Sequence, residues 1–159
     1  MSTPKIEVLV VGAFAATADA VWAHASTMGG VNDELGPWLR MSHPRGLDRL
    51  EGANVPLGQE AFTSTLSLLG LLPFDRHHLV LASVEAGHGF EERSWSWLQK
   101  AWWHDRTITP MHGGCRVTDR VRFTPRVGIA PLARRIVRAV FVHRHERLRA
   151  KFGLLDEAL

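Results

Sequence analysis

The segment Gly89–Arg126 constrains the fold most, because it reads as three consecutive β-strands joined by two short turns. The turns are Leu98–Lys100 and Met111–Gly114, where polar or glycine residues interrupt the alternation of apolar and polar side chains. This pattern predicts a meander of three adjacent antiparallel strands. Every second side chain of each strand then points to the same face of the sheet.

The positions of the two turns predict which residues face each other. With the second turn centred between His112 and Gly113, the facing pairs are Trp102 with Phe123, His104 with Val121, Arg106 with Asp119, and Ile108 with Val117. Centring the first turn on Gln99 places Ser94 opposite His104 and Glu92 opposite Arg106. One face therefore carries the apolar residues Phe90, Trp102, Ile108, Val117, Val121 and Phe123 together with Glu92, His104, Arg106 and Asp119.

Two interpretations of this mixed face remain open. A guanidinium between two carboxylates inside an apolar wall is either a paired ion cluster that specifies the fold or the polar end of a ligand cavity. An arginine can hold two carboxylates at once, or one carboxylate and an anionic head group. The two readings are compatible, since a paired network can form the floor of a cavity.

The remaining elements are predicted from hydrophobic spacing and turn residues. The first half of the chain is predicted to form a strand over Lys5–Phe14, a helix over Ala18–Ser26 capped by Thr17, a short helix over Val31–Leu35 after the Gly29-Gly30 break, and a brief strand Trp38–Met41. An irregular segment 42–58 follows. The next predicted elements are a helix within Gln59–Leu72, a strand over His77–Val84 and, after the meander, a long helix from Leu132 to about Phe152. Within Gln59–Leu72, the three- and four-residue steps between Phe62, Leu66 and Leu69 favour a helix over a strand. This order predicts a curved antiparallel sheet closed by one helix, with a cavity left between them.

The final helix is expected to bury one stripe and expose a basic face. The stripe runs through Leu132, Ile136, Val140, Phe141, His143 or Arg144, Leu148 and Phe152. From Arg126 to Lys151 there are eight lysine or arginine residues and a single acid, Glu146. A solvated face is the default interpretation of such a run, and transient contact with an acidic membrane is the alternative. Nucleic-acid binding is not expected, because no base-stacking aromatic residues alternate with these charges.

Composition narrows the remaining function classes. A chain of 159 residues has the usual length of one domain. No apolar run is long enough to span a membrane. The first residues lack the pattern of a signal peptide. The single cysteine, Cys115, fits a buried thiol in a reducing, cytoplasmic protein. The nine histidines show no three-ligand spacing, so neither a metal nor another cofactor is expected. No serine lies in a nucleophile-elbow motif.

At this point the chain resembles the SRPBCC superfamily, also called the START or Bet v 1-like group. The matching stretches are Phe14–Trp22, Gly89–Ser94, Trp102–Arg106, Thr118–Val121 and Arg147–Gly153. The chain looks most similar to the bacterial polyketide cyclase/dehydrase-like branch. The resemblance implies an α+β helix-grip fold over residues 1–159 as one ligand-binding domain, with a cavity for a hydrophobic small molecule.

The leading hypothesis is therefore a non-catalytic carrier or sensor of a hydrophobic small molecule. The expected cavity residues are Glu92, Ser94, Trp102, His104, Arg106, Asp119, Val121, Phe123, Ile136 and Val140. The alternative is a cyclase/dehydrase-like enzyme in which His104, with Glu92 or Asp119, acts as general acid and base. A second alternative is an interaction module or homodimer that uses Trp95, Trp97 and Trp103 on the outer face. The apolar segment Leu66–Phe74 is a candidate lid.

Overall fold

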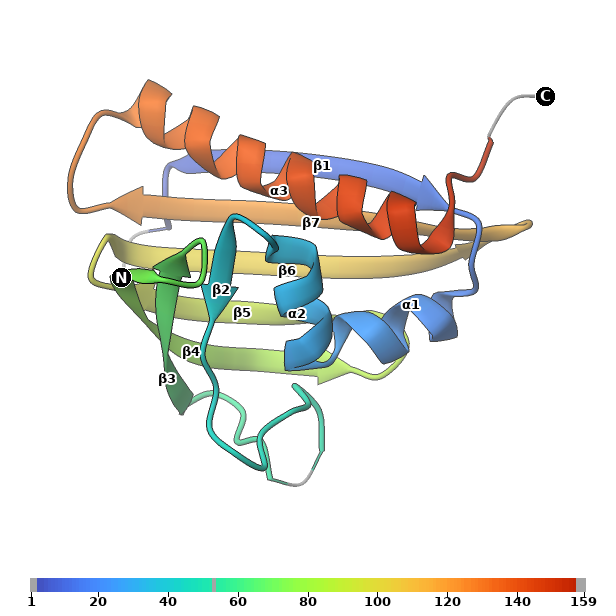
Figure 1. Cartoon of the computed structure of the whole chain (residues 1–159), viewed down its shortest axis with the longest axis horizontal. Helices are drawn as coiled ribbons and strands as arrows, with labels where there is room; N and C mark the ends of the chain where they lie inside the picture. Colours follow the sequence, from blue (N-terminus) through green and yellow to red (C-terminus); the bar gives the residue numbers. More distant parts are fainter. Residues whose placement is uncertain (1–2, 53, 157–159) are drawn as a thin grey trace.

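A seven-stranded antiparallel sheet wraps around the C-terminal helix in the computed structural model, which describes residues 3–52 and 54–156 (Figure 1). The elements are β1 (Ile6–Phe14), α1 (Ala18–Ala25), α2 (Met28–Leu35), β2 (Leu39–Met41), β3 (Glu60–Leu68), β4 (Leu72–Glu85), β5 (Gly89–Ser96), β6 (Gln99–Met111), β7 (Gly114–Pro125) and α3 (Ala130–Phe152). The strands lie in the order β1-β7-β6-β5-β4-β3-β2. The predicted α+β helix-grip fold is confirmed.

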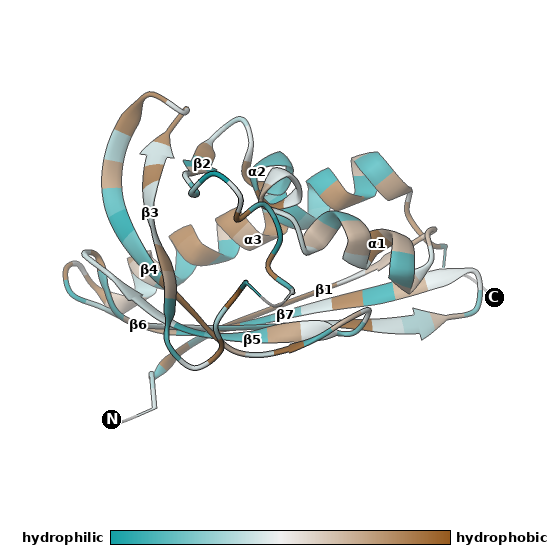
Figure 2. Ribbon diagram, turned by 90° about the horizontal axis from the view of Figure 1, so that it is seen from below, coloured by the Kyte–Doolittle hydropathy of each residue, from teal (hydrophilic) through white to brown (hydrophobic). Residues whose placement is uncertain are grey.

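All three helices cover the same face of the sheet (Figure 2). Thr17 caps α1 as predicted, because its side chain accepts a hydrogen bond of 3.1 Å from the Ala20 amide. Thr27 caps α2 in the same way, through the Gly30 amide at 2.9 Å. The predicted break at Gly29-Gly30 is wrong, since both glycines lie inside α2. The long helix α3 begins with Ala130 and Pro131 and ends at Phe152, where Gly153 is the C-cap residue.

The register between β6 and β7 is as predicted, with Arg106 opposite Asp119 and His104 opposite Val121. The register between β5 and β6 differs by two residues, because β5 already ends at Ser96. Glu92 therefore faces His104 rather than Arg106, and Ser94 faces Trp102. A two-residue shift preserves which face a side chain occupies, so the mixed face survives although its partners change.

The helix predicted within Gln59–Leu72 is wrong, because this segment forms strand β3. It pairs with β2 on one side and β4 on the other, and its backbone hydrogen bonds are made in the sheet. Alternate residues such as Phe62 and Ser64 are buried. The helical spacing of the apolar residues is therefore overridden by strand pairing.

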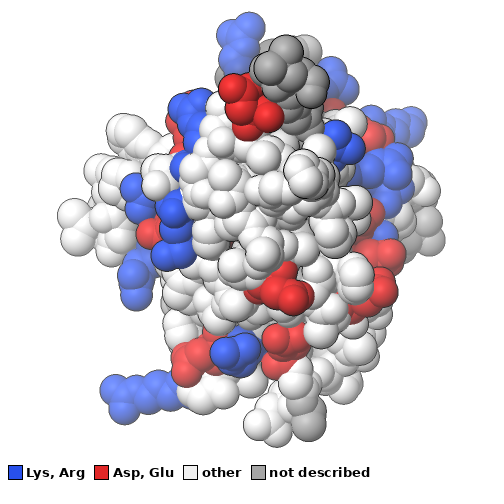
Figure 3. Space-filling view, turned by 90° about the vertical axis from the view of Figure 1, so that its right-hand side faces the viewer, with Lys and Arg blue, Asp and Glu red and all other residues white. Residues whose placement is uncertain are grey.

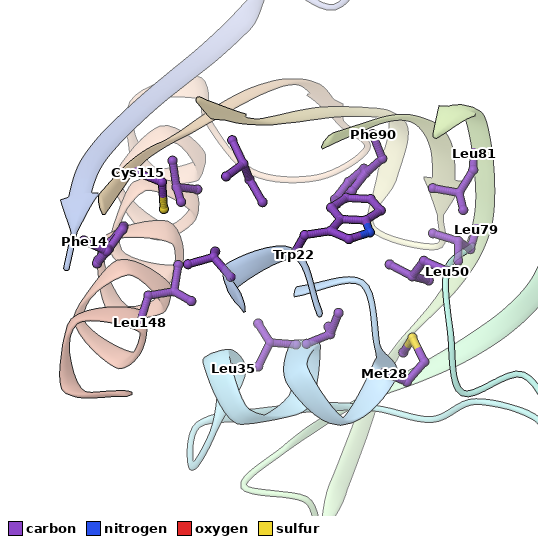
Figure 4. Packing of buried hydrophobic residues seen from close by; sticks show 14 of the residues in the cluster. Phe14, Trp22, Met28, Leu35, Leu50, Leu79, Leu81, Phe90, Cys115 and Leu148 are labelled. Carbon is purple, nitrogen blue, oxygen red and sulfur yellow. The ribbon is translucent and has the colours of Figure 1, made fainter. Parts of the chain in front are cut away.

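Two apolar clusters fill the space between the helices and the sheet. The larger cluster joins α1 and α2 to the sheet and includes Trp22, Phe90 and the buried Cys115 (Figure 4). Burial raises the pKa of the Cys115 thiol. The smaller cluster joins β1 and β7 to α3 through Phe123 and Phe141. Val140 of α3 packs against both clusters.

Candidate functional site

Arg106 is the centre of a buried charge network where the sheet meets α2 and α3. Its Nε and Nη2 donate to the two carboxylate oxygens of Asp119, each at 2.8 Å. Its Nη1 and Nη2 donate to Glu34 of α2 at 2.9 and 2.7 Å. The guanidinium thus lies between two carboxylates, as predicted, but the second one is Glu34 and not Glu92. Arg106 is only 1% exposed.

Asp119 accepts hydrogen bonds from three side chains, two on the neighbouring strand β6 and one on α3. His104 and His145 each place Nε2 at 2.7 Å from a carboxylate oxygen, and Arg106 contributes the bidentate pair. Burial alone would raise the pKa of Asp119, but the Arg106 charge and these hydrogen bonds outweigh it and hold the pKa well below its usual range. Asp119 is therefore a carboxylate at neutral pH and a fixed acceptor.

Glu34 connects this network to α3. Its Oε1 also accepts from Arg144 Nε at 3.1 Å, so one carboxylate joins two guanidinium groups. Burial would raise the pKa of Glu34, and the charges of Arg106 and Arg144 lower it overall. The network therefore ties α2, α3, β6 and β7 together by charge-assisted hydrogen bonds.

Glu92 forms a second group of contacts beside the first. His77 Nε2 lies 2.5 Å from Glu92 Oε2, and the Ser94 hydroxyl donates to the same oxygen at 2.6 Å. His104 links the two groups, because its Nδ1 lies 3.7 Å from Glu92 Oε1 while its Nε2 contacts Asp119. Burial would raise the pKa of Glu92, but His77 and His104 lower it well below the usual range.

Aromatic side chains enclose His104. The Phe141 ring of α3 lies edge-on at 4.8 Å between centroids, and the Phe90 ring lies edge-on at 5.2 Å. Phe141 also lies 6.2 Å from the Trp102 ring, which in turn lies 5.8 Å from Phe123. Of the predicted cavity residues, Trp102, His104 and Phe123 therefore contact core side chains. The imidazole has the partners of a general base but is only 2% exposed.

The predicted inner stripe of α3 mixes two faces of the helix. The buried face consists of Val137, Phe141, Arg144, His145 and Leu148. Ile136 is 55% exposed, so its predicted place inside the cavity is wrong. Leu132, Ile136, Val140 and His143 follow one another at helical spacing along the adjacent face. Only Val140 reaches the buried clusters from that face.

An apolar groove lies where this adjacent face of α3 meets α2 and β2. Its cavity has a volume of about 210 Å³ and is lined by Leu35, Trp38, Leu39, Ala139, Val140 and His143. His143 Nε2 donates to the Gly36 carbonyl at 2.7 Å, which fixes its ring. A second cavity of about 260 Å³ is lined by Leu50, Glu51, Gly52, Val55, Leu57, Val84 and Ala86. We call the first cavity the α3 groove.

The polar residues that the predictions missed are Glu34, His77 and His145. Glu34 lies one helical turn from Val31 on the buried side of α2, and His77 shares the inward face of β4 with Leu79 and Leu81. These spacings are the signals that could have found them. That Glu34 contacts Arg106 has no local signal, because the two residues lie 72 positions apart.

Several solved structures have the same fold as this chain. Protein CV1439 from Chromobacterium violaceum has a TM-score of 0.71 at 8% identity, covering 94% of this chain and 99% of its own. A START superfamily protein from Mycobacterium smegmatis has a TM-score of 0.66 at 8% identity, covering 93% and 97%. DynU16, a protein of the dynemicin biosynthetic locus, has a TM-score of 0.62 at 16% identity, covering 95% of this chain and 49% of its own.

The chain thus has the START-like, or SRPBCC, fold that the sequence resemblance implied. More narrowly, it belongs to DUF8410, a family described as a domain of unknown function, whose model matches residues 13–152. A search of curated proteins found no match. Within the part of the chain that the structure describes, no helix is both long and apolar enough to cross a membrane.

Proposed function

We propose that this protein is a carrier or sensor of a small hydrophobic molecule, which binds in the α3 groove. The observation that carries the proposal is the lining of that groove, where His143 is the one polar side chain among six residues. Concave apolar sites with few polar groups are typical of small-molecule binding. The START-like fold supports the same function class at the level of fold.

The buried charge network is proposed to shape the groove without contacting the ligand. Arg106 already donates to both Glu34 and Asp119, and all three side chains are almost fully buried. Glu34 precedes Leu35, which lines the groove, and Arg144 follows His143. The network therefore fixes α2 against α3 on either side of the groove. The predicted role of Arg106 and His104 at the polar end of a ligand is replaced by this positioning role.

The test blocks the groove with a large substituted side chain and measures the binding of a fluorescent apolar probe, N-phenyl-1-naphthylamine. Ala139 is an exposed α3 residue in the lining, so A139W introduces an indole into the groove. A150W is the matched control, because Ala150 is an exposed alanine near the C-terminal end of the same helix, outside the groove lining. We expect saturable binding to the wild type and to A150W, and loss of binding in A139W. Equal binding by A139W would contradict the proposed site.

The two alternatives have less support. An acid–base role for His104 requires substrate to reach an imidazole enclosed by Phe90 and Phe141. An interaction surface centred on Trp103 is partly covered, because the guanidinium groups of Arg93 and Arg122 lie 4.9 and 5.2 Å from its ring centre. The organisation of residues 1–159 as one ligand-binding domain and the cytoplasmic location remain predictions.

A further inference from the structure

Three chain connections lie toward one end of the sheet, on the left in Figure 1, and Figure 2 shows one of them, the β3–β4 hairpin, projecting from the sheet on the side of the helices. They are the β3–β4 hairpin, the β5–β6 turn and the β7–α3 loop. Backbone hydrogen bonds link the neighbouring segments: the Trp97 amide donates to the Arg76 carbonyl at 3.3 Å, and the Arg126 amide donates to the Leu98 carbonyl at 2.9 Å. The Leu69 amide of the hairpin donates to the Trp38 carbonyl at 2.7 Å. We call this end the loop end.

Large apolar side chains project into solvent from the loop end. The most exposed are Trp38, Leu71, Leu72, Trp97, Val127 and Ile129. Leu71 is 80% exposed at the hairpin tip, and Trp38 beside it is 57% exposed. Exposed apolar residues on a soluble protein are usually scattered, so their concentration on connections at one end points to a binding surface.

The charge of the loop end has one sign. The segments 36–42, 66–76, 96–102 and 124–139 contain the basic residues Arg40, Arg76, Lys100, Arg126, Arg134, Arg135 and Arg138, and all of them are exposed. The same segments contain one acid, Asp75, which is buried and accepts hydrogen bonds from the Arg76 and Leu98 amides. The opposite end of the molecule presents acidic and basic side chains side by side (Figure 3).

We propose that the loop end binds the surface of an anionic lipid membrane. The leucines at the hairpin tip would enter the boundary between head groups and acyl chains, where burial of apolar area is favourable. Trp38 and Trp97 match the preference of indole rings for this interface. The surrounding arginines and Lys100 would lie at the level of the lipid phosphates, where each basic residue adds attraction.

Charge decides between this partner and a second copy of the chain. Two loop ends brought face to face would place seven basic residues of each copy against the same basic set of the other. Like charges in apposition oppose association, whereas an acidic bilayer complements them. The proposal does not depend on a ligand in the α3 groove.

The first experiment measures co-sedimentation of the wild type with two kinds of vesicle. We expect binding to vesicles of phosphatidylcholine and phosphatidylglycerol in equal parts, and much weaker binding to phosphatidylcholine alone. Raising the salt from about 0.1 M to about 1 M shortens the screening length from about 10 Å to about 3 Å and should weaken the binding. Failure to bind the anionic vesicles at the lower salt would overturn the proposal.

The second experiment separates insertion of the hairpin tip from general attraction. The double variant L71D/L72D should lose more than about tenfold in vesicle affinity, because two leucines no longer enter the lipid and two negative charges oppose it. L57D/L154D is the control, since it adds the same charge at two exposed leucines away from the loop end. Circular dichroism checks that both variants fold.

Two further results would overturn the proposal. One is unchanged vesicle binding by L71D/L72D, which would show that the hairpin tip does not contribute to membrane binding. The other is that the wild type does not bind vesicles and sediments as a dimer, whereas L71D/L72D sediments as a monomer. That result would identify the partner of the loop end as a second copy of the chain. The vesicle measurements contain no naphthylamine probe, so their outcome is independent of the A139W test.

Discussion

Glu34 pairs with two buried positive charges, and we expect the stability of the fold to depend strongly on this single carboxylate. It accepts hydrogen bonds from Arg106 and Arg144, and its side chain is fully buried. Replacing it by glutamine removes a charge while keeping the shape. Arg106 then keeps its contact with Asp119, whereas Arg144 loses the charge of the carboxylate that it contacts.

We therefore expect E34Q to lower the free energy of unfolding by roughly 3–5 kcal/mol, the usual cost of removing one partner from a buried ion pair. Urea denaturation measures this loss. The control is E7Q, because Glu7 pairs with Arg120 on the exposed face of the sheet and such pairs contribute little. Equal effects of E34Q and E7Q would show that the network is not a main source of stability.

The acidic members of the network also predict how stability depends on pH. Burial opposes ionisation of Glu92, but His77 and His104 lower its pKa below the ordinary value of 4.5. The unfolded chain then binds more protons than the folded one near pH 4. The contribution of this carboxylate to stability is complete above the unfolded pKa and is lost as the pH falls towards the folded pKa.

We expect the free energy of unfolding to decrease as the pH falls from about 5 to about 3, when it is measured by urea titration at each pH. E92Q should show a flatter profile across this range, because it lacks one of the groups that must be protonated. An unchanged slope in E92Q would mean that other carboxylates, such as Asp119, account for the whole dependence.

At the scale of elements, the contact between α1 and α2 determines where Glu34 lies. A methyl group on Gly30 would come within 1.7 Å of the His24 carbonyl oxygen, which is backbone and cannot rotate away. A methyl group on the neighbouring Gly29 would have open space around it. The two glycines of α2 therefore have different roles, although they are adjacent in the sequence.

G30A should lower the free energy of unfolding by at least about 1–3 kcal/mol, since α2 must move away from α1. G29A should raise it by up to about 1 kcal/mol, because alanine favours a helix over glycine. Chemical denaturation of both variants gives the comparison. If G30A were as stable as G29A, the close packing of α1 against α2 would be wrong.

At the scale of the whole molecule, binding in the α3 groove should stabilise the entire fold. The groove is bounded by α2, β2 and α3, which separate when the chain unfolds. N-phenyl-1-naphthylamine at ten times its Kd should then add about 1.4 kcal/mol to the free energy of unfolding. For a chain of this length, the melting temperature rises by about 3–6 °C. Calorimetry of the wild type should show this rise and A139W should not.

The sequence determined the parts of the structure that depend on neighbouring residues. The alternation along Gly89–Arg126 and the glycine turn before Cys115 were enough to predict that Arg106 faces Asp119. The capping threonine of α1 and the long final helix have equally local signals. The mixed apolar and charged face was also predictable, since period-two alternation survives a two-residue error in register.

Only the tertiary structure decided the partners that come from distant elements. Glu34 contacts Arg106 because α2 packs against the face of the sheet that carries Arg106. The two residues are 72 positions apart, so no local sequence pattern indicates this contact. The segment Gln59–Leu72 became strand β3 because β2 and β4 supply its hydrogen bonds on both sides. The buried face of α3 includes Phe141 and Leu148, as predicted, but not Ile136, because the rotation of a helix depends on what it packs against and not only on its own apolar spacing.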